Sequence, residues 1–207
     1  DIPMPWYANP LQTADRVGPL GEIMPQDEFY GLMKIADVFD LVKLEESFLA
    51  SVKTKLEAHP LFKEDVAKLG TGDTEEEIHR FVKDHHADPI FHNGQLVGCV
   101  KRAHDVDASL TAHIIFENLV SKASGMLAMK HLVDKSGIDV STIDYVIECS
   151  EEACGDMNQR GGGNFAKAIA ESAGAINATG SDLRGFCAAP THALIEAAAL
   201  VKAGVYE

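Results

Sequence analysis

The sequence predicts an α/β protein whose first half is mainly helical. Three observations lead to this fold class. Residues 25–86 carry apolar side chains at helical spacing, Asn93-Gly94 lies between two short apolar runs, and strand-like and helix-like segments alternate after residue 103. We therefore expect residues 1–102 to form a mainly helical extension with a hairpin near 90–100, and residues 103–207 to form an α/β domain.

The N-terminal part begins with residues 1–24, whose prolines, glycines and lack of a sustained period predict irregular chain. Asp27 is expected to cap a helix that runs to about Val38. A second helix is indicated by apolar residues that recur every four positions before Pro60 ends the run, namely Leu44, Phe48, Val52 and Leu56.

Two specific local signals follow. Thr74 and Glu77 have the spacing of a capping box, in which each side chain accepts a hydrogen bond from the other residue's backbone N–H, so they predict the start of a third helix. Asn93-Gly94 tolerates the positive φ angles of a type I′ turn, and the apolar runs beside it predict a β-hairpin.

The C-terminal part opens with a long predicted helix, from about Asp107 to Lys135. We expect it to relax near Ser124-Gly125 and to end at Gly137, since glycine readily adopts the left-handed conformation that closes helices. The run Ile143–Ser150 then has the composition of a buried strand.

The rest of the chain continues this alternation. The composition of residues 151–163 predicts a glycine-rich loop. Asn164 is expected to cap a helix that stops at Gly174. A short polar strand, from about Asn177 to Leu183, then leads into Cys187 and a final helix. Alternation of this kind implies right-handed crossovers and a parallel or mixed sheet.

Charge and composition exclude several classes of function. The chain has 207 residues and a formal net charge of -14, and nucleic-acid binding depends on clustered Lys and Arg, so no nucleic-acid partner is expected. No apolar run has the length of a membrane span and the N-terminus resembles no export signal, so no membrane association is expected. The four cysteines lack framework spacing, which favours reduced thiols and a cytoplasmic location.

Cys187 is the main candidate for chemistry. It lies at the start of the final helix, whose almost entirely apolar composition predicts burial on most sides. Backbone N–H groups and the positive end of the helix dipole would stabilise a thiolate there. The alternative is a cysteine buried among core alanines. His192 projects about 140° away around the helix and is expected to be a core or interface histidine rather than a base.

Other polar clusters give weaker signals. Cys149 and Cys154 bracket a loop, but no second Cys or His pair lies near them in sequence, so no metal is expected. The run Arg160–Asn164 precedes a helix and could cradle a phosphate on backbone N–H groups. It lacks the spacing of known nucleotide loops, so a tight turn is favoured and no cofactor is expected.

The C-terminal hundred residues resemble a known family. The pattern SGIDVSTIDYVIECS, followed by a loop, a helix, a polar strand and GFCAAPTHALIEAAALVKAG, is similar to the N-terminal half of thiolase-like enzymes, especially β-ketoacyl-ACP synthase III. This resemblance implies the N-terminal half of a thiolase-like fold with Cys187 as an acylated nucleophile. In such enzymes a C-terminal half completes the site. We expect that half to be absent here, and this chain to be inactive alone.

A second resemblance covers nearly the whole chain. Four strings look like the β subunits of component C of the glycine/sarcosine/betaine reductase complex: GEIMPQDEFYGLMKIADVFDLV, LVGCVKRAH, IECSEEACGDMNQRGGGNFAKAIAE and NATGSDLRGFCAAPTHALIEAAALVKAGVY. In that family, component C takes the carboxymethyl group carried on the selenocysteine of protein A and releases acetyl phosphate through an acetyl thioester. The resemblance implies an acyltransferase-type subunit whose partners are selenoprotein A and the other component C subunit.

The loop before Asn164 carries the remaining site prediction. The corresponding loop of thiolase-like dimers crosses to the neighbouring subunit, which implies a homodimer and a role in the substrate pocket or dimer contact for Met157, Asn158, Gln159 and Arg160. Two alternatives stay open: a non-catalytic thiolase-like scaffold that docks the selenoprotein and the other subunit, and a β-ketoacyl-ACP synthase III-type condensing enzyme. Acidic charge disfavours the latter, because acyl carrier proteins are themselves acidic.

Overall fold

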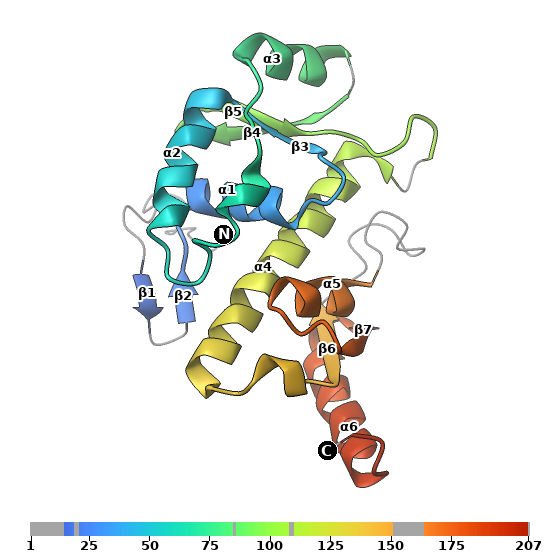
Figure 1. Ribbon diagram of the computed structural model, residues 1–207. Helices are drawn as coiled ribbons and strands as arrows, with labels where there is room; N and C mark the ends of the chain where they lie inside the picture. Colours follow the sequence, from blue (N-terminus) through green and yellow to red (C-terminus); the bar gives the residue numbers. More distant parts are fainter. Residues whose placement is uncertain (1–14, 19–20, 85, 108–109, 151–163, 207) are drawn as a thin grey trace, which may run out of the picture.

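The computed structural model describes residues 15–18, 21–84, 86–107, 110–150 and 164–206 (Figure 1). Its fold is mixed α/β, in agreement with the α/β part of the predicted fold class, whereas the thiolase-like arrangement stays a prediction. The helices are α1 (Gln26–Ala36), α2 (Glu46–Glu57), α3 (Glu75–Asp84), α4 (Ala112–Ser136), α5 (Phe165–Ser172) and α6 (Ala189–Lys202). The strands are β1 (Asp15–Gly18), β2 (Gly21–Ile23), β3 (Val42–Leu44), β4 (Asp88–His92), β5 (Gln95–Val100), β6 (Tyr145–Ser150) and β7 (Thr179–Arg184).

The N-terminal part packs helices α1 to α3 around an antiparallel sheet of order β3-β5-β4. The Asn93-Gly94 turn joins β4 to β5 as expected, with φ angles of 50° and 78°. The capping box also forms, because Thr74 N donates to Glu77 Oε2 at 3.0 Å and Glu77 N donates to Thr74 Oγ1 at 3.2 Å. The capping box and the Asn93-Gly94 turn thus correctly predicted the start of α3 and the hairpin of β4 and β5.

Helix α4 links the upper and lower parts of the molecule (Figure 1). Ile115 and Leu119 belong to the N-terminal core, whereas Met129 belongs to a second core with α5. The expected relaxation near Gly125 is wrong, because α4 is continuous there. A side chain at Gly125 would approach Ile169 Cδ1 of α5 to 2.2 Å, so this glycine permits close helix packing. The division at residue 102 stays a prediction.

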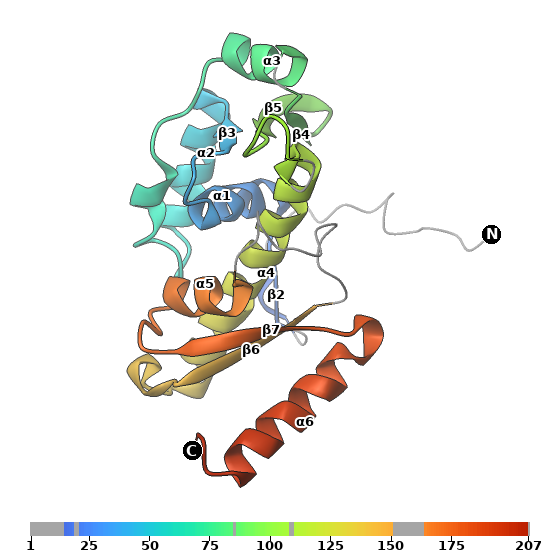
Figure 2. The same cartoon turned by 90° about the vertical axis from the view of Figure 1, so that its right-hand side faces the viewer.

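The C-terminal part is built on two parallel strands. β6 pairs with β7 in register from Tyr145↔Thr179 to Ser150↔Arg184, which confirms the parallel arrangement expected from alternating strand and helix. Helix α5 packs on one face of this sheet and α6 crosses the other (Figure 2). Gly180 allows the contact with α5, since a Cβ there would lie 2.8 Å from the Ala166 side chain.

Three local predictions are wrong in the N-terminal part. Residues 15–18 and 21–23 form the paired antiparallel strands β1 and β2 rather than irregular chain. Pro25 occupies the N-cap of α1, and Asp27 lies in the first turn, where its buried carboxylate pairs with Lys55. Leu44 belongs to β3 and not to the second helix, because pairing with β5 outweighs its helical spacing.

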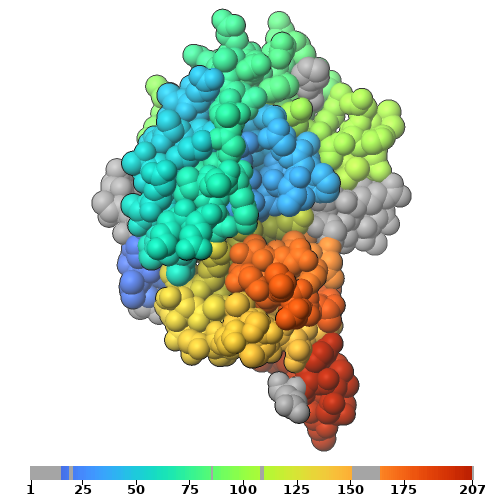
Figure 3. Space-filling model, in the orientation of Figure 1, coloured from blue at the N-terminus to red at the C-terminus, as the bar shows by residue number. Residues whose placement is uncertain are grey.

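The predicted burial of the final helix is also wrong for this chain. Within α6, which is described throughout, only Ala189 is buried, and Leu194 and Ile195 are 73% and 62% exposed. Figure 3 shows α6 protruding from the lower end of the molecule. The physical reason is that a two-stranded sheet covers only one side of a helix whose apolar residues extend around nearly its whole circumference.

Candidate functional site

The turn between β7 and α6 holds Cys187. Residues Phe186–Ala188 form one short 3₁₀ turn, closed by a 3.0 Å hydrogen bond from Ala188 N to Gly185 O. Cys187 is exposed, and α6 begins two residues after it. The structure therefore places Cys187 at a strand-to-helix turn on the surface, not inside a core of alanines.

The backbone immediately before Cys187 is strained. Phe186 has a φ of 50°, in the left-handed region that bulky side chains rarely adopt. Such a conformation costs on the order of 1 kcal/mol and is typical of functional sites, where the surrounding structure fixes an unfavourable turn. A sharp strand-to-helix turn of this kind also presents the nucleophile in α/β-hydrolases, although the fold here is different.

His192 lies beside this turn. A side chain at Gly185 would come within 3.1 Å of His192 Nδ1, so glycine leaves room for the imidazole next to the backbone before Cys187. His192 is exposed, which excludes the core position in this chain and leaves the interface alternative open. The angle around α6 alone does not reveal this contact, because Gly185 reaches His192 from the end of β7.

A groove of about 780 Å³ separates β6 from α6. Figure 2 shows α6 running diagonally across this face of the sheet. The rings of Tyr145 and Tyr206, both in the lining of the groove, stack with centroids 4.9 Å apart. Outside this lining, Glu196 of α6 accepts a 2.9 Å hydrogen bond from Ser181 of β7. Cys149 lies in the groove wall, which is mostly apolar, whereas Cys187 is outside its lining. The groove can hold an apolar group or an apolar partner surface.

The N-terminus of α5 is already occupied by side chains of the protein. Asp182 of β7 accepts hydrogen bonds from Phe165 N and Ala166 N, both at 2.8 Å, and Asn164 accepts one from Lys167 N at 2.6 Å. The cap by Asn164 is as predicted, and Asp182 was not foreseen. Because a carboxylate already fills this helix terminus, a phosphate cradle there is disfavoured.

Arg184 is a second residue that sequence reasoning missed. Its guanidinium pairs with Glu148 of β6 at 2.5 Å and lies 5.3 Å from the centre of the Phe165 ring. Its Nη2 lies 3.8 Å from Asp182 Oδ2, and neither Nε nor Nη2, both buried, has a hydrogen-bond partner among the described residues. The signal available in sequence was weak, namely a lone arginine three residues before the candidate cysteine.

The remaining cysteine and the other candidate residues lie elsewhere in the chain. Burial raises the pKa of Cys99 to about 12, with Asp73 adding to the effect, so Cys99 is a structural thiol. The predicted pocket residues Met157, Asn158, Gln159 and Arg160 lie outside the described residues. In the described part of the chain no three His, Cys, Asp or Glu side chains are grouped to hold a metal, and no helix has the length and apolarity needed to cross a membrane.

Comparison with known proteins relates the chain to subunits of a multi-component reductase complex. Along its whole length it is 57% identical, over 209 aligned residues, to the glycine/sarcosine/betaine reductase complex component C subunit beta of Peptoclostridium acidaminophilum. The chain spans 41% of the length of that relative. The resemblance to this family of β subunits is thus confirmed across the full chain. No protein-family model matches the sequence, and no solved structure matches either.

Proposed function

We propose that the chain is part of a subunit of an acetyl-phosphate-forming reductase component, and that Cys187 carries a two-carbon acyl group as a thioester. The observation that carries this proposal is the exposed Cys187 on a strained strand-to-helix turn. The 57% identity to a component C β subunit supports the assignment to such a complex. The thiolase-like fold remains part of the proposal.

The proposed chemistry has two steps. In the first step the Se–C bond of the carboxymethyl group breaks, its electron pair and a proton go to the CH₂ carbon, and the selenium is oxidised by forming a selenide–sulfide bond with a thiol of the selenoprotein. The Cys187 thiolate forms the C–S bond to the carboxyl carbon, and one carboxyl oxygen leaves as hydroxide, which gives the acetyl thioester. Backbone N–H groups at the start of α6 stabilise the negative oxygen that forms. A phosphate oxygen then attacks the same carbon, the C–S bond breaks with its electron pair returning to sulfur, and acetyl phosphate leaves.

The proposed partners follow from the same relationship. They are the other component C subunit, a selenoprotein that carries a carboxymethyl group, and a second copy of this chain. The predicted dimer loop lies outside the described residues, so the homodimer rests on the resemblance to thiolase-like enzymes alone.

A non-catalytic scaffold is the second candidate, and the exposed apolar surface of α6 favours it. Leu194, Ile195 and Val201 are all exposed on this helix, and Leu194 and Val201 also line the groove beside β6. An exposed apolar helix face of this kind is typical of protein–protein contacts. A catalytic subunit can carry the same apolar surface on α6. The scaffold and the acyl carrier are therefore distinguished by which subunit becomes acetylated.

The decisive experiment follows the acetyl group in the full-length complex. The complex is turned over without phosphate, quenched in acid, and each subunit is measured as an intact protein and then mapped by peptides. We expect one acetyl group on the peptide containing Cys187, and its loss when phosphate is added. Cys187→Ser is expected to lower acetyl phosphate formation on the order of 10³-fold, with Cys149→Ser as the matched control.

The scaffold candidate predicts a different result. In that case the acetyl group appears on another subunit, and Cys187→Ser keeps wild-type turnover. This combination would exclude Cys187 as the acyl carrier while leaving the relationship to the reductase complex intact.

A further inference from the structure

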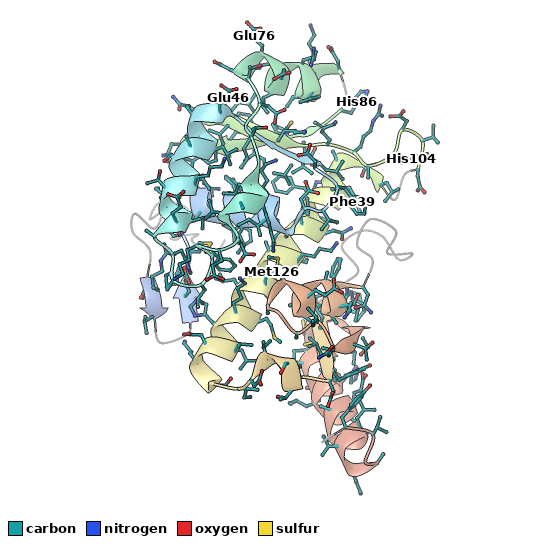
Figure 4. All side chains as sticks on the ribbon, viewed as in Figure 1. Phe39, Glu46, Glu76, His86, His104 and Met126 are labelled. Carbon is teal, nitrogen blue, oxygen red and sulfur yellow. The ribbon has the colours of Figure 1, made fainter. Side chains whose placement is uncertain are left out.

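Lys122 of α4 borders two hollows of the protein. One, of about 410 Å³, lies between the segment after α1 and one side of α4, and the other, of about 240 Å³, lies between α1, α4 and α5. Met126, labelled in Figure 4, lines the smaller hollow one turn further along α4. Most of the side chains that line the two hollows are apolar. The acyl chemistry proposed for Cys187 does not use Lys122.

The amine of Lys122 has no carboxylate partner in direct contact. It forms no ion pair or hydrogen bond within the described part of the chain, and it lies 5.5 Å from the centre of the Phe165 ring. Lysines are seldom buried without a partner, because the ammonium group loses its hydration. Four other lysines with largely buried side chains each pair with a carboxylate, namely Lys34, Lys43, Lys130 and Lys167.

The Lys122 amine is accessible to small molecules. In the described residues, polar side-chain atoms that are both unpaired and without accessible surface lie on His92, Asn118 and Arg184, and the Lys122 amine is not among them. Because the side chain lines both hollows, a molecule in either one can reach the amine.

The surroundings of Lys122 favour its nucleophilic form. Burial lowers the pKa of the Lys122 amine, and Asp37 and Asp182 oppose this effect only in part. Near neutral pH a larger fraction of this amine is therefore neutral than for an exposed lysine. The neutral amine is the form that attacks acyl groups, and desolvation in an apolar site is a known way to activate lysine.

A second cation, Lys68, lines the smaller hollow. It is 54% exposed and pairs with Asp65 at 2.7 Å, and Asp65 also pairs with Lys130. An ammonium group has three N–H donors, so Lys68 can contact an anion while it keeps Asp65. Glu171, the carboxylate in this lining, lies 3.4 Å from the Lys167 amine. The hollow thus combines an anion-binding group with a nucleophile.

We propose that Lys122 is a site of acetylation by acetyl phosphate, which enters the smaller hollow and binds through its phosphate group to Lys68. The Lys122 nitrogen attacks the carbonyl carbon and the N–C bond forms. The bond between that carbon and the bridging phosphate oxygen breaks with its electron pair going to phosphate, which also takes the proton that the amine loses. The product is a neutral acetamide, so the unpaired charge is removed from the hollow.

Acetylation of purified chain by added acetyl phosphate tests the proposal. Peptide mapping gives the initial rate at each lysine, and at pH 7.5 we expect Lys122 to react at least about 5-fold faster than the exposed lysines Lys83 and Lys135. This ratio should fall as the pH rises toward about 10, because the exposed amines then lose their protons as well. In urea-unfolded chain the three rates should be similar. Equal rates in the folded chain at pH 7.5, or a ratio independent of pH, would overturn the proposal.

The role of Lys68 is tested with a charged and a neutral acetyl donor. Lys68→Met should slow acetylation of Lys122 by acetyl phosphate about 5-fold and leave its acetylation by p-nitrophenyl acetate unchanged, since only the first donor carries a phosphate group. Lys63→Met, at a nearby exposed position, is the matched control and should change neither rate. An unchanged rate with acetyl phosphate in Lys68→Met, or an equal loss with both donors, would exclude Lys68 as the phosphate-binding group.

The supply of acetyl phosphate by the same complex rests on the proposed function, whereas the reactivity of Lys122 does not. Added acetyl phosphate reaches Lys122 whether or not Cys187 carries an acyl group. A slow reaction of Lys122 would therefore leave the proposed function intact, and an unacetylated Cys187 in the turnover experiment would leave the Lys122 site intact.

Discussion

Replacing Glu22 with glutamine tests how the N-terminal hairpin is held to the rest of the protein. The Glu22 side chain is fully buried at β2 and contacts groups from three other segments. His59 Nε2 lies 3.0 Å from each carboxylate oxygen, His131 Nε2 of α4 lies 2.5 Å from Oε2, and Arg16 forms an ion pair with Oε1. Glu22→Gln keeps the shape and removes the charge that these groups share.

The hydrogen bonds define which groups carry protons. His59 Nδ1 accepts a 3.1 Å hydrogen bond from Leu61 N, so the proton of the neutral ring is on Nε2 and is donated to Glu22. Burial lowers the pKa of His59 despite the opposing effect of Glu22. Burial alone would raise the pKa of Glu22, but hydrogen bonds from His131, Arg16 and His59 outweigh it and hold that pKa below its usual value.

The expected loss of stability is about 3 kcal/mol. Removing one partner of a buried charge pair typically costs about 3–5 kcal/mol, and the partial exposure of Arg16 and His131 favours the lower end. With a urea dependence of about 2 kcal/mol/M, the unfolding midpoint should fall by about 1.5 M. The assay is urea unfolding at pH 7.5 followed by far-ultraviolet circular dichroism.

The pH dependence gives a second readout. The pKa values of Glu22 and His59 are both lower in the folded protein than in the unfolded chain. The unfolded chain therefore binds more protons, and the free energy of unfolding falls as the pH decreases. The His59 contribution is lost as the pH falls below about 6.5, and the Glu22 contribution as it falls below about 4.5. Glu22→Gln should lack the second loss.

Glu75→Gln is the matched control, since Glu75 is 77% exposed and lies 3.8 Å from His79. Its expected effect is below about 0.5 kcal/mol. Equal effects of the Glu22 and Glu75 substitutions, or an unchanged pH dependence in Glu22→Gln, would refute the reasoning.

Three further predictions concern the cysteines and the C-terminal part. Brief iodoacetamide treatment at pH 7.5 should label exposed Cys187 long before buried Cys99. The Cys99 pKa of about 12 leaves roughly 3 thiols in 10⁵ as thiolate at this pH. Peptide mapping that finds Cys99 labelled first would contradict this prediction. Asp182→Ala removes both carboxylate hydrogen bonds at the start of α5 and should cost about 2–3 kcal/mol, with faster amide exchange of Phe165 and Ala166 as the specific readout. Gly180→Ala places a Cβ 2.2 Å from Val146 O and should lower the free energy of unfolding by about 2 kcal/mol or more. Gly204→Ala, where a Cβ meets open space, should lower it by about 1 kcal/mol. Equal losses in the two variants would contradict the packing argument.

Local chemistry was enough to predict several elements of this protein. The Thr74–Glu77 capping box, the Asn93-Gly94 turn, the cap at Asn164 and the glycine at 137 each act through a few neighbouring residues, so their effect can be seen in a short string. The parallel pairing of β6 with β7 also followed, because a crossover helix between two strands leaves few other arrangements.

Tertiary structure decided what depends on distant partners. Leu44 has helical spacing but pairs with Gly98 of β5, and Glu22 is buried only because His59 and His131 meet it from distant positions. Asp182 caps α5 across the sheet, which no local pattern indicates. The apolar composition of α6 was visible in the sequence, whereas its exposure was not, because burial depends on how much surface the rest of the fold provides and a two-stranded sheet provides little.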